Sequence, residues 1–185
     1  MTEPLEGEAL LDALESGQVR AAFPQDGTWV VPAWVKQGIL DIFRTSAIEP
    51  AGIELRHGSE LAFRDKDAFP VQRFSEASGV RLVPGGSAVR RGAHLAQGVV
   101  CMPPMYVNVG AFVGENSMVD SHALVGSCAQ IGARVHLSAA VQIGGVLEPV
   151  GARPVIVEDD AFIGGSSGIY EGVFIGAGAV IAAGV

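Results

Sequence analysis

The sequence contains few aromatic residues, few cysteines and few basic residues. Aromatic side chains occupy 6% of the 185 positions, so we expect a thin core of aliphatic side chains. The two cysteines, Cys101 and Cys128, form neither a disulfide framework nor a CxxC pair, and we expect free thiols. The 12 Lys and Arg are scattered along a chain of net charge −8, which argues against nucleic acid as a partner.

Long apolar runs are also missing. No stretch approaches the roughly 18 apolar residues of a membrane span. The first residues, MTEPLEGEALLDALESG, are acidic and lack the basic region and apolar run of a secretory signal. We therefore expect a cytoplasmic protein with no membrane partner.

Glycine and aliphatic residues are abundant instead. The chain has 25 glycines and 49% hydrophobic residues, and its length suits one domain with a small appendage. Many glycines combined with few aromatics favour a β solenoid over a helical bundle.

Residues 1–80 are predicted to form a small α-rich cap. Two segments on either side of the Asp26-Gly27 turn signal place apolar residues at helical spacing. These apolar residues are Leu10, Leu11 and Leu14 in the first segment and Trp34, Ile39, Ile42 and Phe43 in the second. Residues 45–80 are predicted to be irregular, with one short extended piece that ends near Phe63.

A period of six residues begins at Val89. An aliphatic residue or cysteine opens each hexad, and a small or β-branched residue mostly follows four positions later. The openers are Val89, Leu95, Cys101, Val107, Val113, Val119, Val125, Ile131, Leu137 and Ile143, and then Val157, Ile163, Ile169, Ile175 and Ile181. A hexapeptide repeat predicts a parallel β-helix over residues 81–185.

The repeat has a simple physical basis. Each hexad supplies a short strand and a corner, and three hexads make a triangular coil whose openers point inward. Successive coils stack at about 4.8 Å, so the openers form aliphatic ladders. We expect about five coils from fifteen hexads. The pause in the repeat over residues 144–155 predicts a loop thrown out from one corner beside a binding face.

Two longer stretches resemble one family. Residues 102–149, MPPMYVNVGAFVGENSMVDSHALVGSCAQIGARVHLSAAVQIGGVLEP, are similar to the central block of bacterial tetrahydrodipicolinate N-succinyltransferases. The cap segment LLDALESGQVRAAFPQDGTWVVPAWVKQGILDIFR resembles the same family. The resemblance implies a left-handed β-helix and a cytoplasmic homotrimer with active sites between subunits. It also implies transfer of a succinyl group from succinyl-CoA, a co-substrate, in lysine and diaminopimelate biosynthesis. The acceptor is the amino group of tetrahydrodipicolinate, a cyclic dicarboxylate that reacts in its ring-opened form. No permanently bound cofactor is implied.

The resemblance also implies site residues. Arg81 and Asp120 occupy the positions that bind the amino-dicarboxylate, and Asp120 is implicated in acid–base chemistry as well. A planar guanidinium suits a carboxylate, and amide formation from a thioester requires a base. The residues alone favour a solvated side chain or a partner of Glu76 for Arg81, and a solvated or turn-capping side chain for Asp120.

Other reactive residues are weaker candidates. Asp120, Ser121 and His122 are neighbours whose side chains point in different directions, so they do not form a catalytic triad. His122 remains a candidate group near the cleft of a neighbouring subunit. Cys101 is expected in the core and Cys128 at a partly exposed corner. A metal site of the kind found in gamma-type carbonic anhydrases is not expected, because no two of His94, His122 and His136 are a multiple of eighteen residues apart.

The chain departs from the family at two places. Its GGSSGIYEG at residues 164–172 stands where the family has G-A-R-S-E-V-V-E-G, so Ser166 replaces an Arg and Gly168 replaces a candidate acid/base Glu. Glu171 survives and is the second candidate catalytic residue. The end, IGAGAVIAAGV, is apolar, and we expect a solenoid truncated at its C-terminal side. An acetyl-CoA-dependent enzyme and a non-catalytic homologue stay open as alternatives.

Overall fold

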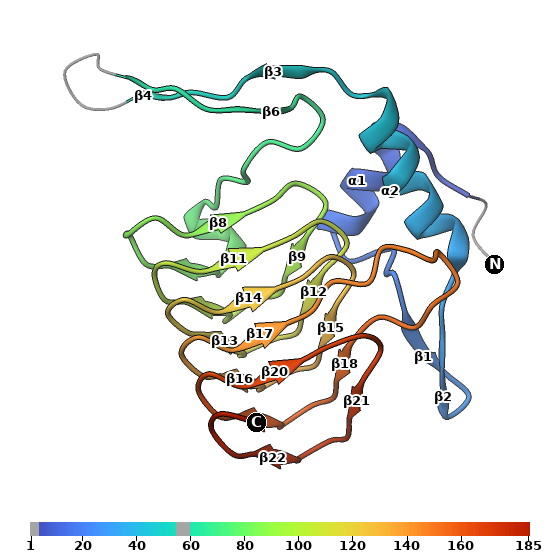
Figure 1. Ribbon diagram of the computed structural model, residues 1–185, viewed down its shortest axis with the longest axis vertical. Helices are drawn as coiled ribbons and strands as arrows, with labels where there is room; N and C mark the ends of the chain where they lie inside the picture. The colour runs from blue at the N-terminus through green and yellow to red at the C-terminus, as the bar shows by residue number, and fades with distance from the viewer. Residues whose placement is uncertain (1–3, 55–59) are drawn as a thin grey trace.

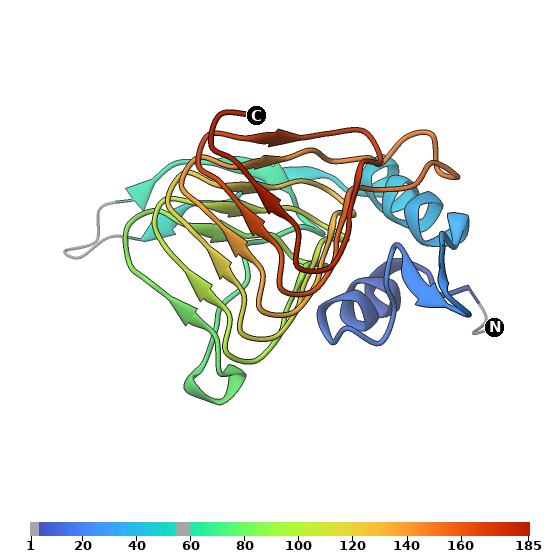
Figure 2. The same ribbon diagram turned by 90° about the horizontal axis from the view of Figure 1, so that it is seen from below.

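The main body of the protein is a parallel β-solenoid with a triangular cross-section (Figures 1 and 2). The computed structural model describes residues 4–54 and 60–185. The first face contains β7 (Arg81–Leu82), β10 (Val100–Cys101), β13 (Met118–Val119), β16 (His136–Leu137), β19 (Phe162–Ile163) and β22 (Val180–Ile181). The second face contains β8 (Ala88–Val89), β11 (Tyr106–Val107), β14 (Leu124–Val125), β17 (Gln142–Ile143) and β20 (Gly168–Ile169). The third face contains β9 (His94–Leu95), β12 (Phe112–Val113), β15 (Gln130–Ile131), β18 (Ile156–Val157) and β21 (Phe174–Ile175).

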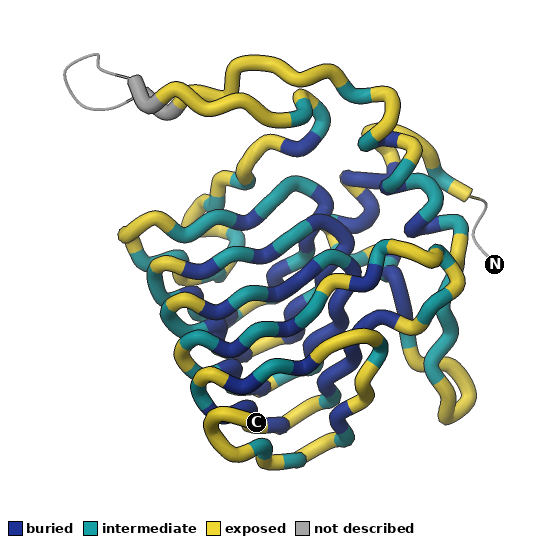
Figure 3. Tube along the Cα trace, in the orientation of Figure 1, coloured by how far each residue is buried: buried dark blue, intermediate teal, exposed yellow. Residues whose placement is uncertain are grey.

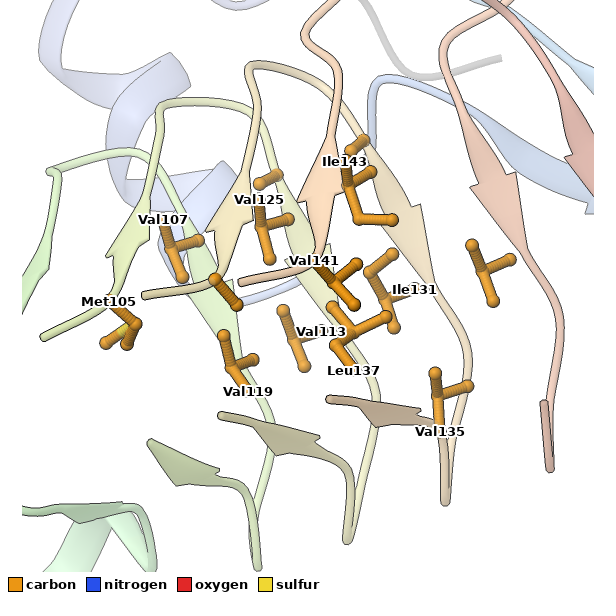
Figure 4. Close-up of a cluster of buried hydrophobic side chains, with 14 of the residues drawn as sticks. Met105, Val107, Val113, Val119, Val125, Ile131, Val135, Leu137, Val141 and Ile143 are labelled. Carbon is orange, nitrogen blue, oxygen red and sulfur yellow. The ribbon is translucent and has the colours of Figure 1, made fainter. Parts of the chain in front are cut away.

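The hexad openers form the solenoid core, which confirms the predicted parallel β-helix. Val119 pairs in register with Cys101 on one side and with Leu137 on the other, so each opener lies above its equivalent in the previous coil. Figure 4 shows these aliphatic side chains pointing into the interior from all three faces. A strand of two residues suffices because one residue faces the core and its neighbour faces out.

Most corners have a left-handed backbone residue at the third position after the opener. Several of these residues are not glycine: His122, Cys128, Arg134 and Ala140 have φ between 56° and 65°. A non-glycine residue in this region costs conformational energy, which the parallel ladders on either side of the corner must offset.

The solenoid begins earlier than the hexad count indicates. Strand β7 pairs with β10 and adds a strand ahead of Val89, the first predicted opener. The period of six did not reveal this strand, because Leu82 and Val89 are separated by one residue more than a hexad. Gly85 and Gly86, with φ of 144° and 90°, accommodate the additional residue.

The cap packs against the third face and the adjoining corner. It consists of α1 (Gly7–Glu15), the hairpin β1 (Phe23–Gln25) and β2 (Thr28–Val30), and α2 (Ala33–Thr45). Both predicted helices are present, and Asp26 and Gly27 form the hairpin turn with positive φ. The cap core includes Val109 and Cys128 of the solenoid, so cap and solenoid share buried surface (Figure 3).

Residues 45–80 contain more structure than predicted. A two-stranded ribbon extends above the first coil from the helices, and its strands are β3 (Ile48–Pro50), β6 (Arg64–Lys66), β4 (Ile53–Glu54) and β5 (Glu60–Leu61) (Figure 1). The short 3₁₀ helix η1 (Glu76–Ser78) follows. The prediction of irregular chain was wrong here because all four strands are short, and β3 and β6 are too exposed to show an alternating pattern.

The helices in the described ranges are too short and too polar to cross a membrane.

Candidate functional site

Arg81 and Asp120 lie on the same face of the solenoid. Arg81 is exposed in β7, and Asp120 directly follows β13. Strand β10 separates them, with Val100 paired to Arg81 on one side and to Met118 on the other. Two strand spacings place β7 and β13 about 10 Å apart. This separation is in the range that an extended dicarboxylate spans with help from the long Arg81 side chain.

Asp120 is held by its own corner. Its backbone N–H donates to the Leu137 carbonyl at 3.0 Å, and its Oδ1 accepts a hydrogen bond from the Ser121 backbone N–H at 2.7 Å. The side chain is half-buried, and within residues 4–54 and 60–185 no donor is bonded to Oδ2. The bond to Oδ1 therefore orients the Asp120 carboxylate, and its Oδ2 is available to a ligand.

Ser121 and His122 do not complete a relay with Asp120. His122 is exposed and has φ of 62°, and its backbone N–H donates to the Pro104 carbonyl. Among the described residues, neither the Ser121 hydroxyl nor the His122 ring is hydrogen-bonded to the Asp120 carboxylate. The predicted absence of a triad agrees with this geometry.

Glu171 lies at a different corner of the solenoid. It follows β20 on the second face, is exposed, and has φ of 46°. It lines a cavity of about 610 Å³ together with the loop at residues 145–153. Arg153 of that loop donates through Nε and Nη2 to the Gly172 carbonyl at 3.0 and 2.8 Å. Within one chain, the structure does not bring Glu171 and Asp120 together.

The loop is anchored to the cap by Lys36. This side chain is completely buried, and its Nζ donates to the Ala152 carbonyl at 2.6 Å. Burial lowers the pKa of Lys36, and a nearby Cys128 acts in the opposite direction. Sequence reasoning did not identify this residue, because a lysine on an amphipathic helix is expected to face solvent.

Gly168 is covered by an aromatic side chain. A Cβ atom at Gly168 would lie 2.8 Å from the Tyr170 hydroxyl oxygen, and one at Gly144 would lie 2.8 Å from Tyr170 Cδ1. The phenol ring thus occupies the space that a side chain at position 168 requires. A side chain at position 168 and the Tyr170 ring in this position therefore exclude each other sterically.

Both cysteines are buried free thiols. Cys101 lies in the solenoid core, as predicted, and burial raises its pKa to about 12. Cys128 was predicted to be partly exposed, and this was wrong because α2 covers its corner. Burial raises the pKa of the Cys128 thiol to about 12 as well. Neither thiol is available as a nucleophile at neutral pH.

His94, His122 and His136 lie on different strands and corners of the solenoid. In the part of the chain that the structure describes, no group of three or more His, Cys, Asp or Glu side chains is arranged to hold a metal ion. The Nδ1–H of His94 donates to the Glu15 carbonyl at 2.7 Å, and the His94 ring stacks on Phe112. His136 stacks on Phe162 on the first face.

Comparison with known proteins gives consistent matches along the chain. The N-terminal part of tetrahydrodipicolinate N-succinyltransferase matches residues 8–45, and the hexapeptide repeat of succinyl-transferase matches residues 154–185. The 2,3,4,5-tetrahydropyridine-2,6-dicarboxylate N-succinyltransferase of Acinetobacter baylyi is 48% identical over 96% of this chain and 64% of its own length. The enzymes of the same name from Paramagnetospirillum magneticum and Idiomarina loihiensis are 48% and 47% identical over 96% and 95% of this chain, and each is covered over 63% of its length.

The chain thus spans slightly less than two thirds of the length of these relatives. The matches include both the cap and the solenoid, the two parts whose packing buries Val109 and Cys128. On this basis the chain belongs to the tetrahydrodipicolinate N-succinyltransferase family.

Proposed function

We propose that the protein transfers a succinyl group from succinyl-CoA to the amino group of ring-opened tetrahydrodipicolinate, a step of lysine and diaminopimelate biosynthesis. The observation that carries the proposal is identity of 48% over 96% of the chain with a relative that bears this name. The residues required for the chemistry by this account, Arg81 and Asp120, are both present on one solenoid face.

Arg81 and Asp120 have distinct roles in this proposal. Arg81 is exposed and binds a substrate carboxylate through its planar guanidinium. The substrate amine attacks the thioester carbonyl, a C–N bond forms, and the C–S bond breaks. Asp120 accepts the proton that the amine loses, and the departing CoA thiolate takes up a proton to leave as the thiol. No covalent enzyme intermediate is needed, because the thioester is already activated.

We further propose a homotrimer with active sites between subunits. Asp120 and Glu171 lie at different corners, so a site that uses both requires corners from two chains. The outward positions of the first face are largely apolar, with Val100, Met118 and His136 half-buried and Phe162 and Val180 exposed in the single chain. Such a largely apolar strip is suited to contact with another subunit.

Succinyl-CoA acts as a co-substrate in this account, no other cofactor is required, and the cytoplasm is the proposed location because it supplies the thioester. Glu171 is the second candidate acid/base, placed beside the 610 Å³ cavity.

Two alternative functions remain. The related one is an enzyme that transfers an acetyl group from acetyl-CoA to the same substrate. A non-catalytic homologue is favoured by one specific observation, the absence of a carboxylate at Gly168 under Tyr170.

Measuring the release of CoA thiol distinguishes the succinyltransferase from the acetyltransferase and from the non-catalytic homologue. The full-length gene product is incubated with 2-aminopimelate, an acyclic amino-dicarboxylate, and with succinyl-CoA or acetyl-CoA in parallel, while its oligomeric state is measured by light scattering. We expect a trimer that releases thiol faster from succinyl-CoA. Faster release from acetyl-CoA would assign the other donor, and no release from an intact trimer would support the non-catalytic reading.

A further inference from the structure

A second cleft lies between the cap hairpin and the solenoid, away from Arg81, Asp120 and Glu171. It has a volume of about 640 Å³ and runs along the corner that follows the third face. Its walls include Arg20, Trp29, His94, Phe112, Glu115 and Glu158. The proposed succinyl transfer gives none of these residues a role.

The guanidinium of Arg20 lies close to two aromatic rings. Its guanidinium carbon lies 3.7 Å from the centre of the Phe112 ring and 5.6 Å from that of Trp29. On the adjacent coil, His94 stacks on Phe112 with ring centres 4.6 Å apart. The guanidinium thus lies within cation–π distance of two aromatic rings, and its hydrogen bonds are made at its edges.

Gln130 fixes one of these edges. Arg20 Nε donates to Gln130 Oε1 at 2.9 Å, and the fully buried Gln130 donates through Nε2 to the Cys128 and Gly110 carbonyls at 2.9 and 3.3 Å. Gln130 cannot turn without losing these bonds. The orientation of the Arg20 guanidinium is therefore set before any ligand arrives.

The other edge of Arg20 is unused. Over residues 4–54 and 60–185, no acceptor is bonded to Nη1 or Nη2, and no carboxylate forms an ion pair with this side chain. Burial lowers the pKa of Arg20 to about 10, and Asp159 acts in the opposite direction, so the group stays cationic at neutral pH. A fixed guanidinium with two free nitrogens at its edge is suited to a carboxylate.

The surrounding carboxylates restrict the ligand further. Glu158 accepts from Trp29 Nε1 at 3.2 Å and from the Ala177 N–H at 3.2 Å, and Asp159 accepts from the Ala133 N–H at 2.9 Å and pairs with Arg134. Glu115 is exposed and has no partner among the described side chains. Three carboxylates near one guanidinium repel a dianion such as phosphate, whereas a positively charged amine is attracted to them.

We propose that this cleft binds a free amino acid with an apolar side chain. The carboxylate accepts hydrogen bonds from Nη1 and Nη2 of Arg20, and the ammonium group faces Glu115 and Asp159. The side chain of the amino acid packs against Trp29 and Pro24, which line the same cleft. The proposal is independent of succinyl transfer, because it uses neither Asp120 nor Arg81.

Binding is measured by the fluorescence of Trp29. The protein has two tryptophans, so Trp34→Phe provides a background in which Trp29 is the only reporter. L-Phenylalanine is the probe, and its amide and its N-acetyl derivative are matched probes that lack the carboxylate or the ammonium charge. We expect saturable binding of phenylalanine with a Kd of about 1 mM or tighter. Both derivatives are expected to bind about tenfold or more weakly.

Variants test the two ends of the ligand separately. Arg20→Gln is expected to weaken binding about tenfold or more, and the exposed Glu115→Gln about threefold. Arg44→Gln, which removes an exposed arginine paired with Asp41 on α2, is the control and is expected to bind normally. Since Glu115 is exposed and the derivatives need no substitution, the test stands even if Arg20→Gln fails to fold.

Three results would overturn the proposal. The first is no saturation by phenylalanine up to about 10 mM. The second is equal binding of phenylalanine and both derivatives. The third is displacement of phenylalanine by inorganic phosphate at similar concentrations, which would make the cleft a general anion site.

Discussion

Lys36 shows how a single buried charge affects this fold. Its side chain has no exposed surface, and the only bond of its Nζ among the described residues is the one to the Ala152 carbonyl. Burying an ammonium group with so few partners is costly, and the cost falls when the proton is lost. Lys36 connects α2 to the loop that carries Arg153. The buried ammonium group therefore lies at the contact between the cap and this loop of the solenoid.

Stability is expected to depend on pH through Lys36. Its pKa is lowered in the fold below the ordinary 10.5, so the unfolded chain binds more protons between these two values. The free energy of unfolding therefore rises with pH across this interval, by up to about 1.4 kcal/mol per pH unit. Lys36→Met is expected to remove this rise, measured by urea unfolding at several pH values.

Lys66→Met is the matched control for that experiment. Lys66 Nζ also donates to a backbone carbonyl, that of Ser46 at 2.7 Å, but the side chain is only half-buried. The control is expected to retain the pH dependence of the parent protein. A Lys36→Met variant whose stability rises with pH as steeply as the parent's would show that Lys36 is not the source.

Substitutions at Gly168 and Tyr170 are expected to have non-additive effects on the free energy of unfolding. Introducing Glu at position 168 forces the Tyr170 ring to leave its place, because a Cβ there meets the ring. We expect Gly168→Glu alone to lower the free energy of unfolding by about 1 kcal/mol, and Gly168→Glu with Tyr170→Val to lower it less. Tyr170→Val alone is the reference in a double-mutant cycle measured by thermal unfolding. Additive effects of the two substitutions would contradict the steric link.

At the scale of elements, the inward ladders carry the stability of the solenoid. Ile131 is fully buried between Val113 and Val157 in neighbouring coils. Ile131→Ala is expected to lower the free energy of unfolding by about 2–5 kcal/mol. Ile48→Ala, at an exposed position of β3, is the control and is expected to change it by less than about 0.5 kcal/mol. Urea unfolding of both variants checks this, and equal effects would show that the ladder is not the main source of stability.

The elements also show which features could be predicted from sequence. The openers recur every six residues and all lie in the solenoid core or against it, so their inward orientation could be predicted from the sequence. The partial exposure expected for Cys128 was wrong, because α2 covers its corner and that contact joins segments far apart in the chain. The cleft around Arg20 was not predicted for the same reason, since Phe112 and Gln130 are about a hundred residues distant from Arg20 in sequence.

The candidate site was predictable only in part. Arg81 and Asp120 were identified through family resemblance, and the hexad register implies their shared face once β7 is added to the solenoid. Lys36, Arg153 and Tyr170 were missed, because their importance depends on a loop and a corner whose contacts leave no periodic signal. Glu171 was identified, but its position at another corner follows from the three-dimensional arrangement of the coils.

At the scale of the whole molecule, the single chain presents its candidate groups on separate corners. The apolar strip on the first face and the separation of Asp120 from Glu171 both favour an assembly in which neighbouring chains complete each site. In such an assembly, Asp120 and Glu171 are expected to contribute unequally. Asp120 is held by the Ser121 N–H, whereas no bond to the Glu171 carboxylate is present in the described part of the chain.

The most direct test of the account is the effect of Asp120→Asn on thiol release from succinyl-CoA in the presence of 2-aminopimelate. The substitution keeps the size of the side chain and removes the base. We expect kcat to fall by about a hundredfold or more while the oligomeric state and the thermal stability stay unchanged. Glu171→Gln, measured in parallel, is expected to have a smaller effect. Full activity in Asp120→Asn would contradict the assignment of Asp120 as the base.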